Sequence, residues 1–372
     1  MATDRPERQP ASSDIGALEG AACRIDLRPP AGSIAEIPTG LGPEGAAVDV
    51  ERRLAYVTAS RSHAITFVDL DALAPVAEVE VGREPTDMAF DARSGRAFSA
   101  DSRSDTVSVI DAARRRLEKQ IVVPAYPSGI VVDEERRRVY CGCAAAGAVV
   151  VIDADRLDVI GTLPAELGSG GVAVSPDGLR VLASNFMTAS VTVIDTGTGE
   201  SVARVPVGGG PCSMVVSRSR GEAYVANSFS DSVTRIDIAA AEPTGTMRVG
   251  RGPVGLYVSG DERRLYVGNR GEGTVSVLDL DTGAELRRLE VGEAPAGCVI
   301  DPVTGWLLVS NAGTNTLSVL DPAAARSPSG DPHPLIGRPL PAFELPDLRT
   351  GRLRTSREWA ERLYILNFFA SW

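Results

Sequence analysis

Residues 253–294 read PVGLYVSGDERRLYVGNRGEGTVSVLDLDTGAELRRLEVGEA, and this stretch decides the fold. Four short runs within it, 255–258, 264–268, 274–278 and 285–291, are rich in apolar and β-branched residues, and Gly, Asp and Asn separate them. Short runs bounded by turn-forming residues are typical of β-strands. The stretch therefore predicts four short strands joined by tight turns.

The same unit returns every 42 residues, seven times, without an insertion. Each copy begins with Pro or Ser, at Pro43, Pro85, Pro127, Ser169, Pro211, Pro253 and Pro295. A second column of Asp closes the third predicted strand, at Asp69, Asp111, Asp153, Asp195, Asp237, Asp279 and Asp321. Four strands in roughly 40–45 residues is the spacing of a propeller blade. We therefore predict an all-β fold, a seven-bladed β-propeller.

The ring is expected to close with a strand from the beginning of the chain. The seventh copy, from Pro295 to Asp321, lacks a fourth strand, and residues 33–40 match that strand ahead of the first copy. Pairing the two would remove the open sheet edges that promote aggregation.

Composition places the chain among globular proteins rich in turns, with 43% hydrophobic residues, 38 Gly and 25 Pro in 372 residues. The net charge of −11 disfavours nucleic acid as a partner. Residues 1–19 hold no apolar run, so we predict neither a signal peptide nor a membrane span, and the chain as it stands is expected in the cytoplasm.

The five cysteines and two histidines form no familiar metal or haem motif, since no Cys-x-x-Cys occurs. Cys141 and Cys143 share one face of a predicted strand without a supporting second pair, so we interpret them as small apolar residues. No metal and no cofactor is predicted. Arg235 interrupts an apolar column of the third strand and is expected to pair with an acid.

Three recurring phrases, Tyr-Val-x-Asn, Thr/Ser-Val-x-Val-Ile-Asp and Val-Gly-x-x-Pro, resemble the YVTN-type (YncE-like) β-propeller repeat over residues 33–321. The family includes bacterial surface-layer and exported propellers and is related to the ring that holds haem d in nitrite reductases. The resemblance implies a propeller and favours export, in contrast to the start of the chain. Such rings serve as scaffolds, ligand binders, enzyme subunits and lactonases, so the resemblance implies no single activity.

In a propeller the first strand of each blade lines the central channel. The loops from strand four to strand one and from strand two to strand three share one face, which we call the loop face. The loop face is the predicted binding surface for an unidentified protein or small molecule. The Asp column and an Asn column ending the second strand, at Asn185, Asn227, Asn269 and Asn311, are interpreted as turn-forming architecture, the Asn through left-handed backbone.

Candidate binding residues are those that break the columns, together with His63, Arg103 and Asp105, which with Asp101 give blades 1 and 2 the most varied polar loops. Asp87 and Ser213 replace a Gly of the first strand, and Asp101 replaces the Asn. The complete set of candidates is His63, Asp87, Asp101, Arg103, Asp105, Cys212 and Ser213.

The end of the chain has a different pattern. Gly337 to Asp347, followed by Tyr364-Ile-Leu-Asn-Phe-Phe-Ala-Ser-Trp372, resembles the opening of a redoxin domain of the TlpA and peroxiredoxin-like type. In that family the last phrase leads into Cys-x-x-Cys or the peroxidatic Cys. The predicted organisation is a disordered tail, a propeller, a linker and a truncated thioredoxin-like α/β segment, at residues 1–22, 23–322, 323–336 and 337–372.

The function predicted first is a non-enzymatic propeller that binds or scaffolds a partner through its loop face, with an inactive redoxin fragment. One alternative is the front part of a propeller-redoxin fusion, a thiol-disulfide oxidoreductase or peroxidase whose catalytic Cys lies beyond Trp372. A second alternative is a lactonase-like enzyme, whose activity Asp101→Ala or His63→Ala would abolish.

Overall fold

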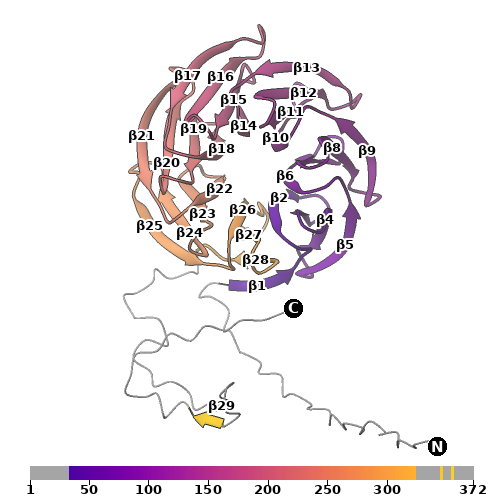
Figure 1. Ribbon diagram of the computed structural model, residues 1–372, viewed down its shortest axis with the longest axis vertical. Helices are drawn as coiled ribbons and strands as arrows, with labels where there is room; N and C mark the ends of the chain where they lie inside the picture. Colours follow the sequence, from indigo (N-terminus) through magenta and orange to yellow (C-terminus); the bar gives the residue numbers. More distant parts are fainter. Residues whose placement is uncertain (1–32, 324–343, 347–352, 356–372) are drawn as a thin grey trace, which may run out of the picture.

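The structure is a computed structural model that describes residues 33–323, 344–346 and 353–355. Seven four-stranded antiparallel sheets surround a central axis, and the first strand of each blade lies innermost (Figure 1). This arrangement confirms the predicted all-β, seven-bladed fold.

The strands follow the 42-residue unit from blade to blade. Blade 1 contains β2 (Pro43–Asp49), β3 (Leu54–Ala59), β4 (Ala64–Asp69) and β5 (Ala74–Glu80). Blade 2 contains β6 (Pro85–Asp91), β7 (Arg96–Asp101), β8 (Thr106–Asp111) and β9 (Arg116–Val122). Blade 3 contains β10 (Pro127–Asp133), β11 (Arg138–Cys143), β12 (Ala148–Asp153) and β13 (Val159–Pro164). Blade 4 contains β14 (Ser169–Val174), β15 (Arg180–Asn185), β16 (Ser190–Asp195) and β17 (Ser201–Pro206).

The remaining blades complete the ring. Blade 5 contains β18 (Pro211–Ser217), β19 (Glu222–Asn227), β20 (Ser232–Asp237) and β21 (Glu242–Arg248). Blade 6 contains β22 (Pro253–Val258), β23 (Arg264–Asn269), β24 (Thr274–Asp279) and β25 (Glu285–Glu290). Blade 7 contains β26 (Pro295–Ile300), β27 (Leu307–Asn311), β28 (Thr316–Leu320) and β1 (Ser33–Pro38).

Blade 7 is built from both ends of the described ring, as predicted. Its strand order is β1-β28-β27-β26, and Ile37 of β1 lies opposite Leu317 of β28. The Oγ of Ser318 donates a hydrogen bond of 2.6 Å to Glu36, which fixes the register on the solvent side.

The hydrophobic core lies between adjacent blades. β3 is buried at all six positions, because neighbouring strands and the next blade cover both of its faces. The ring of Tyr56 packs edge-on against Phe67 of its own blade and tilts against Phe90 of blade 2, with ring centroids 4.8 and 5.4 Å apart. Each sheet therefore depends on its neighbours for burial of its apolar residues.

The Asp column forms turns, as predicted. In all seven copies the carboxylate accepts at least one main-chain N–H from the following turn; Asp153, for example, accepts from Asp155 and Arg156 at 3.0 and 2.9 Å. This local bond favours the turn over continued strand.

The Asn column is structural, but its predicted left-handed backbone is wrong. The residue with positive φ lies four positions later, as at Asn315 with φ 58°. The column Asn is itself buried, and its amide donates to hydroxyl groups five and seven residues onward; Asn227 donates to Ser232 and Thr234 at 3.2 and 2.9 Å.

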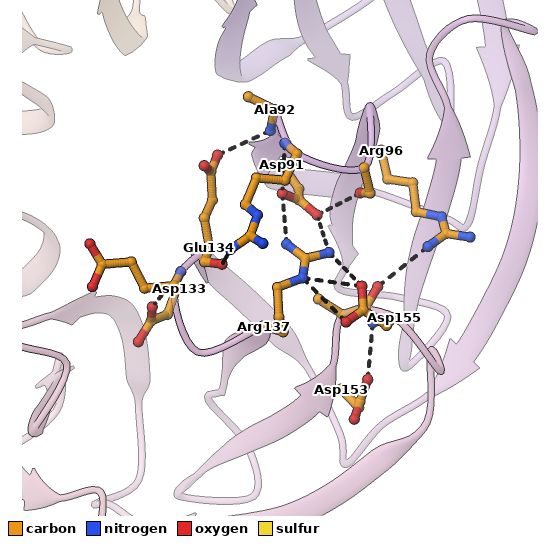
Figure 2. Close-up of polar contacts among 12 residues, drawn as sticks. Asp91, Ala92, Arg96, Asp133, Glu134, Arg137, Asp153 and Asp155 are labelled. Atoms are coloured by element: carbon orange, nitrogen blue, oxygen red, sulfur yellow. Dashed lines mark hydrogen bonds and ion pairs between the residues drawn. The ribbon is translucent and has the colours of Figure 1, made fainter.

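On the face opposite the loop face, ion pairs join neighbouring blades. Figure 2 shows Arg137 of blade 3 between Asp91 of blade 2 and Asp155 of its own blade, with guanidinium-to-carboxylate distances of 2.8 and 2.7 Å. Asp91 is fully buried. Arg53 repeats the arrangement where blades 7 and 1 meet, with Asp301 at 2.7 Å.

Arg235 finds an acid, as predicted, because its Nε lies 3.8 Å from Glu222 and also donates to Thr244. Cys141 and Cys143 are buried free thiols. None of the residues that the structure describes forms a helix long and apolar enough to cross a membrane.

Beyond the ring, β29 (Glu344–Pro346) and β30 (Leu353–Thr355) pair antiparallel. They fall within residues 337–372, for which a redoxin-like segment was predicted. The helix and last strand predicted for that segment, the predicted tail 1–22 and most of the linker 323–336 lie outside the described residues.

Candidate functional site: the loop face and the central channel

The loop face is a continuous ring of short loops held by two repeating main-chain bonds. In every blade the first residue of the strand two–three loop donates to the last residue of the preceding strand four–one loop, as Ser102 N–H does to Glu84 O at 3.0 Å. The last residue of the same loop then accepts from the next connection, as Asp105 O does from Val123 N–H at 3.0 Å. The predicted sharing of one face is thereby confirmed.

Two candidates, His63 and Asp105, are each the last residue of a strand two–three loop, and both have positive φ, 56° and 55°. The Nδ1 of His63 accepts from Glu84 N–H at 3.1 Å, and Oδ1 of Asp105 accepts from Tyr126 N–H at 2.9 Å. Equivalent bonds come from Asp231 and Asn315 in other blades. We therefore assign His63 and Asp105 a role in joining consecutive loops.

Asp101 is fully buried within blade 2. Its carboxylate accepts from the hydroxyls of Ser99, Thr106 and Ser108 at 2.8, 3.0 and 2.6 Å. Burial raises its pKa, and these hydrogen bonds oppose that rise only in part. Thr106 and Ser108 stand five and seven residues onward, where the column Asn of other blades finds its hydroxyl partners.

Asp101→Asn is expected to stabilise the ring by about 1 kcal/mol at pH 7, because the amide keeps these partners and removes a buried charge. The pKa of Asp101 is higher in the folded than in the unfolded state. The wild type therefore loses stability relative to the variant as the pH rises from below the unfolded pKa to above the folded pKa. The advantage should therefore shrink at acidic pH. Thermal unfolding at pH 7 and pH 4 measures it, and a variant less stable at pH 7 would contradict the assignment.

Arg103 lies at the exposed rim of the loop face, where its Nε is 3.2 Å from Glu84. The structure thus places His63, Arg103 and Asp105 among the loops of blades 1 and 2, and Asp101 inside its sheet. It does not bring them together at the channel, where a lactonase-like site would need converging acid, base and cation.

The first strands enclose a central channel of about 840 Å³, lined by residues of all seven blades. One position of the first strand, that of Gly255, is Gly in five blades because the next blade's backbone approaches closely. A Cβ on Gly255 would lie 2.0 Å from Ala296 O, and one on Gly129 would lie 2.4 Å from Gly170 O.

Asp87 and Ser213 line this channel, as their place on first strands predicted, and Cys212, expected on the loop face, lines it as well. The two oxygens of Asp87 accept N–H groups of Met88 and of Ile130 in the next blade, at 2.8 and 3.1 Å. Burial raises the pKa of Asp87 to about 6 and that of Cys212 to about 11.

The sequence interpretation missed an ion pair at the channel mouth. Arg270, from the loop between β23 and β24, bonds Glu44 at the start of β2 through two contacts of 2.8 and 3.0 Å. The pair bridges blades 6 and 1 on either side of blade 7. A separate pocket of about 330 Å³ beside it is also lined by Arg61. No Glu or Asp stands at the position of Glu44 in the other six copies, and this departure was the available signal.

An exposed apolar cluster on blades 4 and 5 was also missed. Leu167, Met187 and Phe229 are 63%, 74% and 75% exposed. Phe186 packs edge-on against Phe229 with ring centroids 5.0 Å apart, which holds both rings in place. The signal was present in the loops 186–189 (FMTA) and 228–231 (SFSD), where three of the other copies have Ser-Arg-Ser or Arg-Gly-Glu and two have the small residues AAAG and AGTN.

The charged residues of the loop face are distributed unevenly. Five arginines, Arg61, Arg83, Arg103, Arg251 and Arg270, lie on loops of blades 1, 2 and 6 or on the connections that lead into blades 2 and 6. The apolar sector, by contrast, contains no Lys or Arg; it comprises the loops 123–126, 144–147, 165–168, 186–189, 207–210 and 228–231. Among residues 33–323, 344–346 and 353–355, no group of three or more His, Cys, Asp or Glu side chains is arranged to hold a metal ion.

Fold and channel define a closed seven-bladed β-propeller with an asymmetric loop face. The sequence profile of YncE-like β-propellers matches residues 72–264, more than half of the chain. The protein belongs to the YncE-like β-propeller family, as the repeat predicted.

Comparison with solved structures adds support for the fold. The chain is similar to the structure titled Kuenenia stuttgartiensis hydrazine synthase, with a TM-score of 0.68 and 20% identity over 83% of this chain and 100% of that one. Identity at this level shows the fold alone. No curated protein matches the sequence.

Proposed function

We propose that the protein is a binding module whose apolar sector docks a segment of a partner protein. The observation that carries the proposal is the cluster of Leu167, Phe186, Met187 and Phe229, side chains from three loops of one part of the loop face. Aromatic and Met side chains are enriched at protein interfaces, whereas an isolated exposed apolar residue needs no explanation.

The loops around the cluster suit docking. They are held by the repeating main-chain bonds of the ring, so little conformational entropy would be lost on binding. Gly208, Gly209 and Gly210 stand between the loops that carry Met187 and Phe229. Because glycine has no side chain, a partner backbone can approach the cluster closely there.

The charges indicate the chemistry of the partner. The ionised side chains in the apolar sector at neutral pH are the carboxylates of Glu166 and Asp231. Glu166 pairs with Arg204 at 2.6 Å, while Asp231 is exposed beside Phe229. A segment with aliphatic or aromatic anchors and a flanking Lys or Arg complements this surface, and an acidic segment does not.

Selection from a random 12-residue peptide display library tests the proposal. Wild-type protein should enrich peptides with at least two large apolar residues and a basic residue. The double change Met187→Ser with Phe229→Ser should reduce binding of a selected peptide at least tenfold, because it removes both exposed anchors.

The matched control is Val202→Ser with Leu286→Ser, which removes comparably exposed apolar side chains from the outer strands β17 and β25. It should bind the selected peptide as the wild type does. Enrichment of no peptide family, or equal loss in both double variants, would contradict docking at the apolar sector.

A second candidate is the propeller-redoxin fusion, favoured by the order of the two motifs in 337–372 and by the β29–β30 hairpin, whose first strand lies in the first motif. Sequencing the coding DNA past the Trp372 codon should reveal Cys-x-x-Cys or a single Cys within a few residues. Unrelated sequence in every reading frame would remove this candidate.

A further inference from the structure

The central channel carries an asymmetry that partner docking does not use. Five blades have Gly at the first-strand position of Gly255, but blade 2 has Asp87 there and blade 5 has Ser213. Glycine at this position allows the next blade's backbone to approach closely, and a carboxylate does not serve that packing. Departure from the repeat in a concave, lined space is a feature of ligand sites.

Asp87 has unused capacity to bind a cation. Its two oxygens hold one N–H each, from Met88 and Ile130, and an ionised carboxylate offers about four acceptor positions. Among the residues that the structure describes, no cationic side chain pairs with Asp87. The other carboxylate near this end of the channel, Glu44, is already bound to Arg270.

The charged side chains that line the channel are mainly negative, as Asp87 is. Five carboxylates and one guanidinium line it: Glu44, Asp87, Asp133, Glu134, Glu135 and Arg218. Glu44 and Asp133 are paired with Arg270 and Arg136, which leaves three carboxylates against the guanidinium of Arg218. Low-dielectric walls around charges of one sign focus the electric field and raise the local concentration of counter-ions. The channel therefore favours a positive ligand over a negative one.

The walls below Asp87 are apolar. Phe90, Val132, Val174, Val216 and Tyr257 line the channel and are partly exposed within it. Two serines also line the channel, Ser128 on the neighbouring blade 3 and Ser213 on blade 5. The channel thus combines one unpaired carboxylate, nearby hydroxyl groups and an apolar interior.

We propose that the channel binds an organic ammonium ion with an apolar body. The ammonium group would donate hydrogen bonds to the carboxylate of Asp87, and its alkyl or aryl part would lie along the apolar walls. A bare metal ion would leave those walls in water, and a carboxylate ligand would meet like charge at Asp87.

Isothermal titration calorimetry with hexylamine and 3-phenylpropylamine at pH 8 and low salt tests the proposal, with hexanol and hexanoate as uncharged and anionic comparisons. At least one amine should bind saturably and more tightly than both comparisons. Asp87→Asn keeps the size of the side chain and should weaken amine binding at least tenfold, because the charge is lost while a hydrogen-bond acceptor remains.

The same titration at pH 5 adds an independent reading. Alkylammonium ions stay charged at both pH values, whereas Asp87, with a pKa of about 6, becomes protonated at pH 5. The Cys141 thiol, the titratable group that Asp87 influences, stays neutral because its pKa is raised. Wild-type binding should therefore fall at pH 5, and binding by Asp87→Asn should not change.

Three results would overturn the proposal: saturable binding by neither amine, hexanoate binding as tightly as hexylamine, or equal amine affinity for Asp87→Asn and wild type. Equal thermal unfolding midpoints of Asp87→Asn and the wild type at pH 5 would show that the variant is folded. Binding of the selected peptides should persist in Asp87→Asn, so failure of the channel site and failure of the apolar sector are distinguishable.

Discussion

Replacing Asp91 with Ala is expected to lower the free energy of unfolding by about 3 kcal/mol or more, because it leaves the guanidinium of Arg137 without its buried partner. Asp91 is fully buried and also accepts from Ser94 at 2.5 Å and from the N–H of Arg93. Guanidinium chloride unfolding at pH 7 measures the loss.

Asp155→Ala is the matched control. It removes the other carboxylate of the same guanidinium, but Asp155 is 61% exposed, and exposed pairs contribute about 0–1 kcal/mol. Equal losses in the two variants would mean that burial does not set the strength of this network (Figure 2).

The Asp91 contribution should depend on pH in a defined direction. Burial alone would raise the pKa of Asp91, but hydrogen bonds from Arg137 and Ser94 outweigh burial and hold it below the ordinary value. The stabilisation is therefore complete above the unfolded pKa of about 3.9 and is lost as pH falls toward the folded value. The gap between wild type and Asp91→Ala should narrow below pH 4.

The second large effect is expected for Gly255→Ala, at about 3 kcal/mol or more. The added Cβ would lie 2.0 Å from Ala296 O, so the first strands of blades 6 and 7 would have to separate. Backbone cannot rotate away as a flexible side chain can. Thermal unfolding should show a lowered midpoint.

Gly170→Ala offers a control in the same ring of first strands. Its Cβ would find its nearest neighbours at 3.7 Å, an ordinary contact, so the change should be within about 0.5 kcal/mol of wild type. A similar loss at Gly170 would show that flexibility, and not close approach, explains glycine in these strands.

The fold was predictable because the residues that form strands and turns recur at the same positions in seven copies of the 42-residue unit. The column from Asp69 to Asp321 marks the end of the third strand in each blade. The absence of a fourth strand in the seventh copy indicates how the ring closes. The mechanism of the Asn column was not predictable from identity alone. Asn227 depends on Ser232 and Thr234, and many polar residues can occupy those positions.

The site was predictable only in part. Breaks in a column correctly directed attention to Asp87 and Ser213 in the channel, but His63 and Asp105 drew attention through their chemistry although they serve a repeated loop contact. That contact is made by His, Asp or Asn in different blades, so no column of identical residues marks it.

Contacts between distant segments were harder to foresee. Glu44 and Arg270 are 226 residues apart, and only the curvature of the ring brings them together. The apolar sector is likewise assembled from six loops, of which only 186–189 and 228–231 carry a Phe side chain.

The pairing of β1 with β28 has a consequence for how the protein is made. Blades 1 to 6 consist of consecutive strands and can form in order as the ribosome delivers them, but blade 7 must wait for a strand made more than 280 residues after its partner. Until residue 316 emerges, β1 and β27 each have an unpaired edge. Ring closure is therefore the last step in forming the ring, and until then these unpaired edges can pair with a neighbouring chain.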